Sequence, residues 1–253
     1  MKTNPENFGD LLSMYEFIAK GLSDRTIDSF LNGGIGIIHI ENWNNDYSAL
    51  EKIGSVNQQD YYNNTAVKVG GDDNIWQNLD MPWHSDRAYS EKIDDIAVLQ
   101  CVDIEDSASP TLFCDMQTPV QYASEEILNA GKTEYWNKLS KYYDYAVYPV
   151  TYKKESHRRL HKRSKVKRPL IMEDKLGWFL TYNQAYTICE FSEEIEDLCY
   201  KSKYIYEHKW KKGDLLLFNN RKITHKRFGS ESHIRRDLLR ISLTAKDPIC
   251  QNI

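Results

Sequence analysis

The feature that most constrains the fold is a series of short apolar segments, bounded by turn residues, that runs through most of the chain. Residues 35–40 form a β-branched run after Gly33-Gly34, and a turn at Gly213-Asp214 precedes the apolar residues 215–218. Runs of this length that are bounded by glycine are typical of buried strands. We expect further strands within residues 66–69, 95–102, 111–116, 145–152, 169–172, 178–181, 204–210 and 237–245.

Helical patterns precede and interrupt these strands. Apolar positions recur at helical spacing after residue 8, and Ser23-Asp24 is typical of the cap of a second helix, so we expect a helical N-terminal segment at 6–32. Helices are also expected at 119–139 and 192–201. Because helices do not alternate regularly with strands, we expect one mainly β domain over 1–253. Its core is expected to be a double-stranded β-helix (jelly roll) flanked by α-helices.

Composition excludes several classes of function. The 253 residues carry a net charge of −4, so no global basic field favours nucleic acid or an anionic membrane. No apolar run approaches the roughly 18 residues that a membrane span needs. The five cysteines are odd in number and lack Cys-x-x-Cys spacing, which argues against a disulfide framework or a structural zinc site. We expect a reducing, cytoplasmic location.

The chemistry of the chain is indicated by His84-Ser85-Asp86 and by a distant histidine, His225. Alternation along a strand points His84 and Asp86 the same way, and a third ligand can arrive from another strand. Two imidazoles and one carboxylate on one face of iron(II) leave three positions for a bidentate cosubstrate and dioxygen. Roughly one His-x-acid pair is expected by chance in this composition. A second pair, His39-Ile40-Glu41, closes an apolar run, and we interpret it as a strand and its exit.

Two arginines follow His225 at a spacing that suits a strand. Arg236 and Arg240 lie eleven and fifteen residues after it, on the same face as Leu238. Burying two guanidinium groups on an otherwise apolar strand is costly without anions. A carboxylate ligand would satisfy one of them as a bidentate partner.

Taken in order, these pieces resemble the taurine dioxygenase family of iron(II)/2-oxoglutarate-dependent oxygenases. The resemblance covers most of the chain from about Gly33. Its motifs are Trp-His-Ser-Asp at 83–86, Pro-Thr-Leu-Phe at 110–113, Arg-Pro-Leu-Ile at 168–171, Trp-Phe-Leu-Thr-Tyr-Asn at 178–183, Gly-Asp-Leu-Leu-Leu-Phe-Asn-Asn-Arg at 213–221, and then His225 with the two arginines.

The resemblance implies a distorted jelly-roll core and a role for each matching residue. His84, Asp86 and His225 would be the iron ligands, and Arg236 would clasp the distal carboxylate of 2-oxoglutarate with help from the hydroxyl of Thr111. Arg240 matches a position that binds an acidic substrate group or lies beside the cosubstrate. An ordinary strand threonine at 111, and a structural salt bridge from Arg240 to Asp237 or Asp247, remain alternatives.

The implied reaction is hydroxylation of an unactivated C–H bond with release of succinate and CO2. It requires Fe(II), 2-oxoglutarate and dioxygen. Related halogenases have a small residue in place of Asp86, so its carboxylate argues against halogenation, while desaturation and cyclisation stay open. We expect a small carboxylate-bearing metabolite as the substrate, such as an amino acid or a derivative. The alternatives are a carrier-protein-bound or nucleic-acid substrate, and a non-catalytic jelly-roll binding protein.

Proximity to these motifs suggests four further substrate contacts, although core packing is the simpler role for the aromatic ones. They are Trp83, Arg87, Tyr89 and Trp178. Residues 153–168 are strongly basic and lie between expected strands. This insertion is interpreted as a lid over the site, a solvated loop, or a docking surface for a nucleic acid or an acidic carrier protein, of which the docking surface is not favoured.

Overall fold

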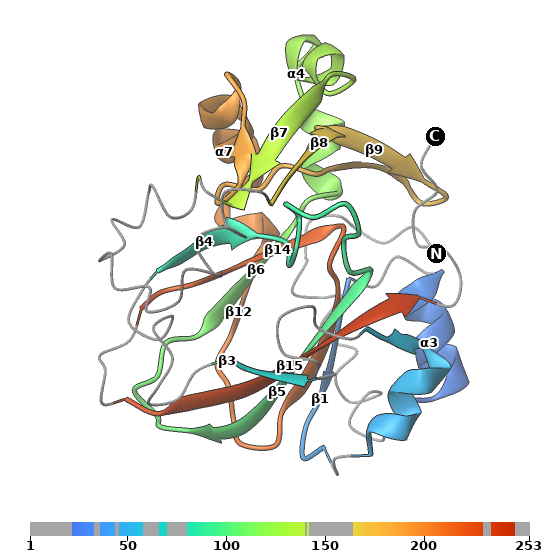
Figure 1. The fold of residues 1–253 in the computed structure, drawn as a ribbon, viewed down its shortest axis with the longest axis vertical. Coiled ribbons are helices and arrows are strands. Elements are labelled where there is room, and N and C mark those ends of the chain that lie inside the picture. The colour runs from blue at the N-terminus through green and yellow to red at the C-terminus, as the bar shows by residue number, and fades with distance from the viewer. Residues whose placement is uncertain are drawn as a thin grey trace.

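Two antiparallel β-sheets form the centre of the molecule (Figure 1). The computed structural model describes residues 22–32, 36–43, 46–57, 66–69, 80–139, 141, 164–229 and 234–245. The larger sheet has the order β1-β13-β5-β15-β2, and β3 also pairs with β15. Its strands are β1 (Ile37–Ile40), β13 (Leu215–Asn219), β5 (Ile96–Ile104), β15 (Arg236–Ala245), β2 (Gly54–Val56) and β3 (Ala66–Val69).

The smaller sheet lies across from the larger one and has the order β12-β6-β14-β4. Its strands are β12 (Ile205–His208), β6 (Thr111–Asp115), β14 (Ile223–Arg227) and β4 (Met81–His84). Phe113 and Ile223 of this sheet pack with Leu99, Phe218 and Leu238 of the larger sheet in one buried cluster. This apolar layer between two antiparallel sheets confirms the expected jelly-roll core.

Strand β13 shows why its sequence is continuously apolar. Leu216 and Phe218 face the smaller sheet, whereas Leu215 and Leu217 belong to a second cluster on the outer face of the larger sheet. Helix α3 (Asp24–Leu31) covers that outer face with Phe30, and the 3-10 helix η1 (Tyr47–Lys52) also packs there. The second half of the expected N-terminal helical segment is confirmed, and residues 6–21 lie outside the described residues.

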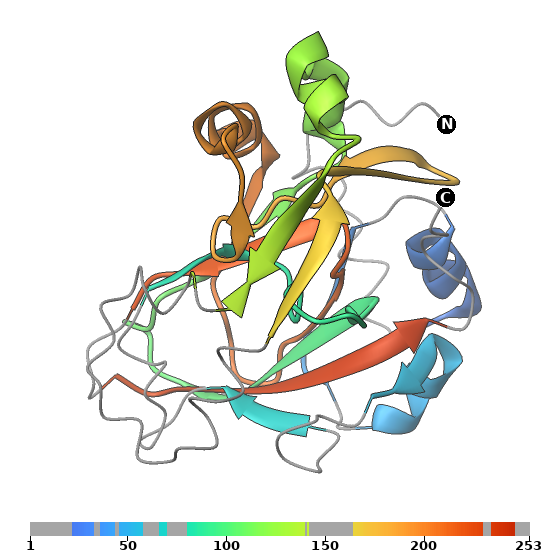
Figure 2. The same cartoon turned by 45° about the horizontal axis from the view of Figure 1, so that its top comes forward.

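The outer face of the smaller sheet is covered by α4 (Glu125–Ala130) and α7 (Ser192–Cys199), with the 3-10 helices η2 (Thr118–Tyr122) and η3 (Ser202–Tyr204) (Figure 2). Cys114 of β6 packs here against Ile195 of α7 and the fully buried Tyr182. The alternation of β6 therefore sends Phe113 inward and Cys114 outward. Side chains of the smaller sheet that point inward reach the space between the sheets, where the site described below lies.

The helix expected over 119–139 is wrong in its second half. Helix α4 ends at Ala130, and at the C-cap residue Gly131 an added Cβ would lie 2.5 Å from the side chain of Ile171. The chain then forms β7 (Glu134–Lys138), which pairs with β8 (Lys165–Pro169) and β11 (Thr187–Ile188), beside the hairpin of β9 (Ile171–Asp174) and β10 (Gly177–Leu180). Pairing with strands far along the chain overrides the helical pattern here.

Strand β8 also changes the interpretation of the basic segment 153–168. Lys165 to Arg168 belong to a sheet, and residues 153–163, where a lid was expected, lie outside the described residues. Among the residues that the structure describes, no helix is long and apolar enough to cross a membrane.

Candidate metal centre and cosubstrate site

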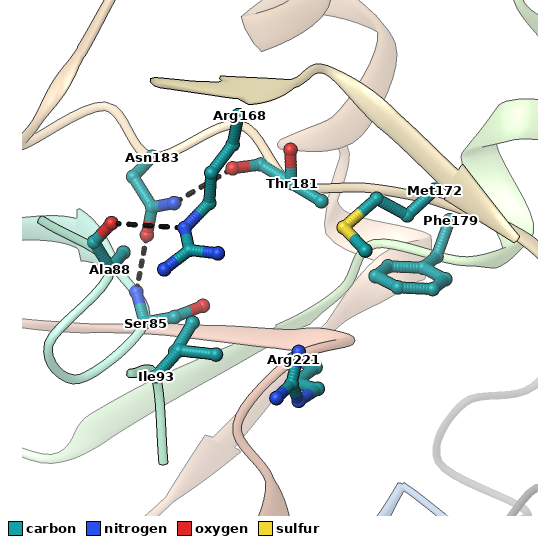
Figure 3. Close-up of a pocket in the computed structure, with 9 residues that line it drawn as sticks. All are labelled: Ser85, Ala88, Ile93, Arg168, Met172, Phe179, Thr181, Asn183 and Arg221. Carbon is teal, nitrogen blue, oxygen red and sulfur yellow. Dashed lines mark hydrogen bonds between the residues drawn. The ribbon is translucent and has the colours of Figure 1, made fainter. Parts of the chain in front are cut away.

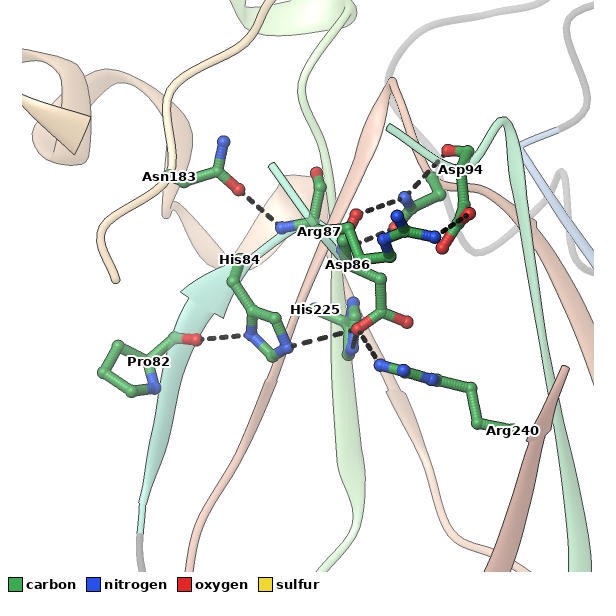
Figure 4. Close-up of polar contacts among 10 residues, drawn as sticks. Pro82, His84, Asp86, Arg87, Asp94, Asn183, His225 and Arg240 are labelled. Carbon is green, nitrogen blue, oxygen red and sulfur yellow. Dashed lines mark hydrogen bonds and ion pairs between the residues drawn. The ribbon is translucent and has the colours of Figure 1, made fainter. Parts of the chain in front are cut away.

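The three proposed metal ligands meet between the two sheets. Strands β4 and β14 are neighbours, and their register places His84 opposite His225, with ring centroids 4.1 Å apart. Asp86 follows two residues after His84, just beyond the end of β4. All three side chains are buried, and Figure 4 shows them pointing toward one another.

The three side chains lie too far apart to form hydrogen bonds with one another. The Nε2 atoms of His84 and His225 lie 3.9 and 4.0 Å from the same Oδ1 atom of Asp86, and one ligand atom from each residue fits within 4.8 Å of the others. The buried Oδ2 of Asp86 has no hydrogen-bond partner among the described residues. A bound cation would satisfy this oxygen, so the cluster fits a metal ion.

The protonation states also suit a transition metal. Nδ1 of His84 lies 2.8 Å from the carbonyl oxygen of Pro82, which can only accept, so Nδ1 carries the proton and Nε2 keeps a free lone pair. Burial lowers the pKa of His84, and it lowers the pKa of His225 to about 3. Burial alone would raise the pKa of Asp86, but Arg240 and the two histidines outweigh it and lower that pKa. Neutral imidazoles therefore face a carboxylate at neutral pH.

Two asparagines hold the backbone of the motif, and sequence reasoning assigned them no role. Asn220 accepts a hydrogen bond from the amide N of Asp86 (2.7 Å) and donates one to its carbonyl oxygen (2.9 Å). Asn183 accepts one from the amide of Ser85. Both asparagines stand in the stretches 178–183 and 213–221 that carry the family resemblance, and this was the available signal.

A small pocket lies beside the loop that follows the metal motif, and Ser85, Ala88 and Ile93 are among the residues that line it (Figure 3). Arg168 enters it from β8 and donates hydrogen bonds to the carbonyl oxygens of Ala88 (3.5 Å), Ser90 and Glu91 (3.1 Å). The end of the basic segment thus anchors the loop that follows the metal motif, instead of lying free in solvent.

Arg236 and Thr111 form a second part of the site. Arg236, on β15, is buried and donates from Nη2 to the hydroxyl of Thr111 (2.7 Å) and from Nε to the carbonyl oxygen of Ser109 (3.2 Å). Burial first, and then the neighbouring Arg227, lower the pKa of Arg236 to about 9. A buried guanidinium held by neutral acceptors beside a second cation favours an anion at this position. Sequence reasoning missed Arg227, which lies two residues after His225 on β14.

Arg240 contacts the metal centre directly. Its Nη1 donates to Oδ1 of Asp86 at 2.9 Å, the oxygen that faces both histidines. The alternation of β15 brings Arg236 and Arg240 to the same face, as the sequence indicated. A structural salt bridge was one alternative for Arg240, and its partner in this structure is Asp86.

The four further substrate candidates separate into two groups. Tyr89 packs edge-on against Tyr186 (5.0 Å), which in turn packs against His84 (6.0 Å), so Tyr89 lies close to the centre. Arg87, in a left-handed backbone conformation (φ 58°), has its Nη1 3.5 Å from Oδ1 of Asp94.

The two tryptophans are not brought to the centre. Trp83 stacks on Tyr200 in the outer cluster, because alternation along β4 sends it opposite to His84. Trp178 is 48% exposed on β10. Trp83 therefore contributes to core packing, and Trp178 faces outward, away from the metal centre.

Comparison with known proteins identifies the family. The family model described as "Taurine catabolism dioxygenase TauD, TfdA family" matches residues 45–242. The chain belongs to this family. It is therefore a dioxygenase that uses iron(II), 2-oxoglutarate and dioxygen. No curated protein matches the chain.

Several solved structures share the TauD-family fold. A crystal structure of AAD-2 in complex with Mn(II) and N-oxalylglycine has a TM-score of 0.69 at 17% identity, over 92% of this chain and 93% of that one. A putative α-ketoglutarate-dependent 2,4-D dioxygenase from Burkholderia xenovorans gives 0.68 at 15% identity, over 90% of both chains. A taurine dioxygenase from the same organism gives 0.66 at 10% identity, over 91% and 85%.

Proposed function

We propose that this TauD-family enzyme hydroxylates an unactivated C–H bond of a small carboxylate-bearing metabolite, an amino acid or a derivative of one. The observation that carries the proposal is the position of Arg240, whose guanidinium touches Asp86 at the metal centre and is partly exposed. A cationic group at that place can orient a substrate carboxylate within reach of the metal. Succinate and CO2 leave as the products of 2-oxoglutarate.

In this proposal His84, Asp86 and His225 hold the iron, which supplies the redox chemistry that activates dioxygen when it is bound. The protein fixes the geometry of these ligands. The carbonyl of Pro82 sets the tautomer of His84, and Asn220 holds the backbone of Asp86. Rigid outer partners of this kind keep ligands oriented and raise metal affinity.

Arg236 and Thr111 bind the distal carboxylate of 2-oxoglutarate in the same proposal. The hydroxyl oxygen of Thr111 already accepts hydrogen bonds from Arg236 (2.7 Å) and from the indole of Trp210 (2.9 Å). Its own hydrogen is then directed to a third acceptor. A carboxylate placed there receives one hydrogen bond from the threonine and charge-assisted bonds from the arginine.

Tyr186 and Tyr89 line the proposed substrate side. Tyr186 is buried against His84, and Tyr89 packs on Tyr186. Their rings exclude water from the reacting carbon and offer apolar contact to the aliphatic part of a substrate. We further propose a cytoplasmic location, where a reducing environment keeps iron ferrous.

Anaerobic titration with iron(II) and 2-oxoglutarate tests the cofactor roles, read from the weak visible absorption band of the chelate. Arg236→Ala is expected to weaken 2-oxoglutarate binding, and Arg240→Ala to weaken substrate binding with little change in 2-oxoglutarate affinity. Amino acids and related carboxylates are then screened by succinate release. The reverse pattern in the two arginine variants would exchange their roles, and unchanged metal binding in both His84→Ala and His225→Ala would refute the ligand assignment.

One observation favours a second candidate, in which the substrate is bound to an acidic carrier protein or a nucleic acid. Three lysines on one face of β7 and β8 surround the ring of Trp136: Lys138, Lys165 and Lys167 lie 5.1 to 5.6 Å from its centroid. Such a basic and aromatic face can bind a polyanion. Turnover that depends on a partner, falls steeply with salt and is lost in Lys165→Gln/Lys167→Gln would favour this candidate.

A further inference from the structure

A second cluster of two histidines and one aspartate lies apart from the metal centre. His39 comes from β1, His208 from β12, and Asp214 directly precedes β13, so the cluster joins an edge of the larger sheet to an edge of the smaller one. All three side chains are buried. Nε2 of His39 lies 3.1 Å from Oδ1 of Asp214, and Nε2 of His208 lies 3.1 Å from its Oδ2.

The contact of His208 with Asp214 is a hydrogen bond, and that of His39 is a close polar contact of the same length. Asp214 also accepts a bond from the amide of Lys211 (2.8 Å), and these donors lower its pKa although burial alone would raise it. Since an ionised carboxylate only accepts, Nε2 of His208 carries the proton. Its Nδ1 is then an acceptor for the hydroxyl of Tyr206 at 3.0 Å. Nε2 of His208 therefore has no free lone pair for a metal.

The cluster is connected to the proposed 2-oxoglutarate site through Trp210. Register between β12 and β6 sets His208 opposite Thr111. The imidazole of His208 packs edge-on against the indole of Trp210, with centroids 4.5 Å apart and planes at 86°. Nε1 of Trp210 then donates to the hydroxyl of Thr111 at 2.9 Å, where Nη2 of Arg236 also donates.

We propose that Asp214 and His208 are positioning residues for the distal carboxylate of 2-oxoglutarate, and that they act through Trp210. Asp214 fixes the ring of His208, His208 fixes the plane of Trp210, and Trp210 fixes the rotamer of Thr111. The threonine oxygen, held by two donors, turns its hydrogen toward the carboxylate that Arg236 attracts. This inference rests on the proposed function of Arg236 and Thr111.

Calorimetric binding to the Mn(II)-loaded protein tests the proposal without turnover. Trp210→Phe keeps an aromatic ring and removes the indole N–H, and His208→Phe removes the bond to Asp214. Each is expected to raise the Kd of 2-oxoglutarate about tenfold, by analogy with the smallest losses of affinity seen when an outer partner of a metal ligand is removed. The Kd of pyruvate, which has the 2-oxoacid group and lacks the distal carboxylate, should stay the same. A purely structural defect would weaken both ligands.

The double variant Trp210→Phe/His208→Phe separates a connected path from two independent effects. If His208 acts through Trp210, the double variant binds 2-oxoglutarate as each single variant does, whereas additive losses would refute the path. Asp115→Asn is the matched control, because it alters a buried carboxylate at the other end of β6 that bonds to Thr118 and the amide of Gln117. It should leave both Kd values unchanged, with thermal melting confirming that each variant is folded.

Two results overturn the inference in different ways. Variants that bind 2-oxoglutarate as tightly as the wild type show that the cluster positions nothing. A second equivalent of Mn(II) or Zn(II), bound by the wild type and lost in His208→Phe, shows that the cluster is a metal site. Failure of the wild type itself to bind Mn(II) and 2-oxoglutarate would instead refute the proposed function.

Discussion

Two histidines and one aspartate form each of two buried clusters in this protein, and the clusters differ in how their polar atoms are hydrogen-bonded. In the first, His84 and His225 stand 3.9 and 4.0 Å from Asp86. In the second, His39 and His208 stand 3.1 Å from Asp214. The position of the ring proton accounts for the difference. The carbonyl oxygen of Pro82 holds the proton of His84 on Nδ1 and leaves a free lone pair on its Nε2, whereas Asp214 requires the proton of His208 to lie on Nε2. Residue identity alone therefore does not distinguish a metal site from a hydrogen-bond network.

The largest expected difference between the clusters is in metal binding. Because Nε2 of His84 has a free lone pair and Nε2 of His208 carries a proton, the wild type should retain one equivalent of Mn(II) after gel filtration, measured by elemental analysis. His225→Gln should lose it and His39→Gln should keep it. Loss of metal in His39→Gln, with a folded protein by circular dichroism, would remove the distinction between the clusters.

In the metal-free protein, the second cluster should contribute more than the first to the free energy of unfolding. Asp214→Ala leaves the imidazole of His208 and the amide of Lys211 without their acceptor and removes the contact of His39, and at about 1 to 3 kcal/mol for each buried donor left unsatisfied it should cost about 3 to 5 kcal/mol. Asp86→Ala should cost less, about 1.5 to 3 kcal/mol, because it removes one charge-assisted bond and the guanidinium of Arg240 that loses this bond is partly exposed to water. Urea unfolding measures both, and equal losses would contradict the comparison.

The dependence of stability on pH should separate the clusters further. Folding lowers the pKa of His225 from 6.5 to about 3, so the unfolded chain binds the proton first as the pH falls. The folded state then loses about 1.4 kcal/mol per pH unit from this group below pH 6.5, and His225→Gln should flatten that slope. Folding also lowers the pKa of Asp214, so its contribution to stability is fully present above the usual aspartate pKa of 3.8 and is lost only as the pH falls below that value. Metal-free unfolding curves between pH 4 and 7 give the slope from His225, and their extension to lower pH gives the slope from Asp214.

The smallest effect is expected at the edge of the second cluster. Tyr206→Phe removes only the hydroxyl that bonds to Nδ1 of His208, so it should cost about 0.5 to 1.5 kcal/mol in the free energy of unfolding. The Kd of 2-oxoglutarate should change less than about twofold, since the bond from His208 to Asp214 remains. A larger change in Kd would place Tyr206 inside the positioning path.

Sequence patterns predicted the jelly roll, and strand alternation predicted that His84 and Asp86 point the same way. His225 was added by the order of the motifs that the chain shares with the family, and the structure brings the three side chains together. The apolar run also predicted strand β1, which contains His39. We interpreted His39-Ile40-Glu41 only as this strand and its exit, and assigned His39 no partner. The partner of His39 is Asp214, 175 positions away, whereas Glu41 forms an exposed pair with Lys211. Nothing local indicates which acid a buried histidine meets.

The parts that sequence did not predict all depend on contacts between distant segments. Asn183 and Asn220 hold the metal motif through backbone hydrogen bonds, and an amide side chain gives no sign of which backbone it will meet. The β7 strand replaces a helix because β8 and β11 pair with it. Arg168 was counted within a basic run, yet its partners are the carbonyl oxygens of a loop 77 to 80 positions earlier.

The contact between Arg240 and Asp86 has a consequence for how the binding of metal and the binding of 2-oxoglutarate affect each other. Before any metal arrives, the carboxylate at the centre is already balanced by a guanidinium. A divalent ion therefore adds its full charge to a buried region, and dianionic 2-oxoglutarate removes that excess. Metal and cosubstrate must then strengthen each other's binding, and thermodynamic reciprocity makes the two enhancements equal.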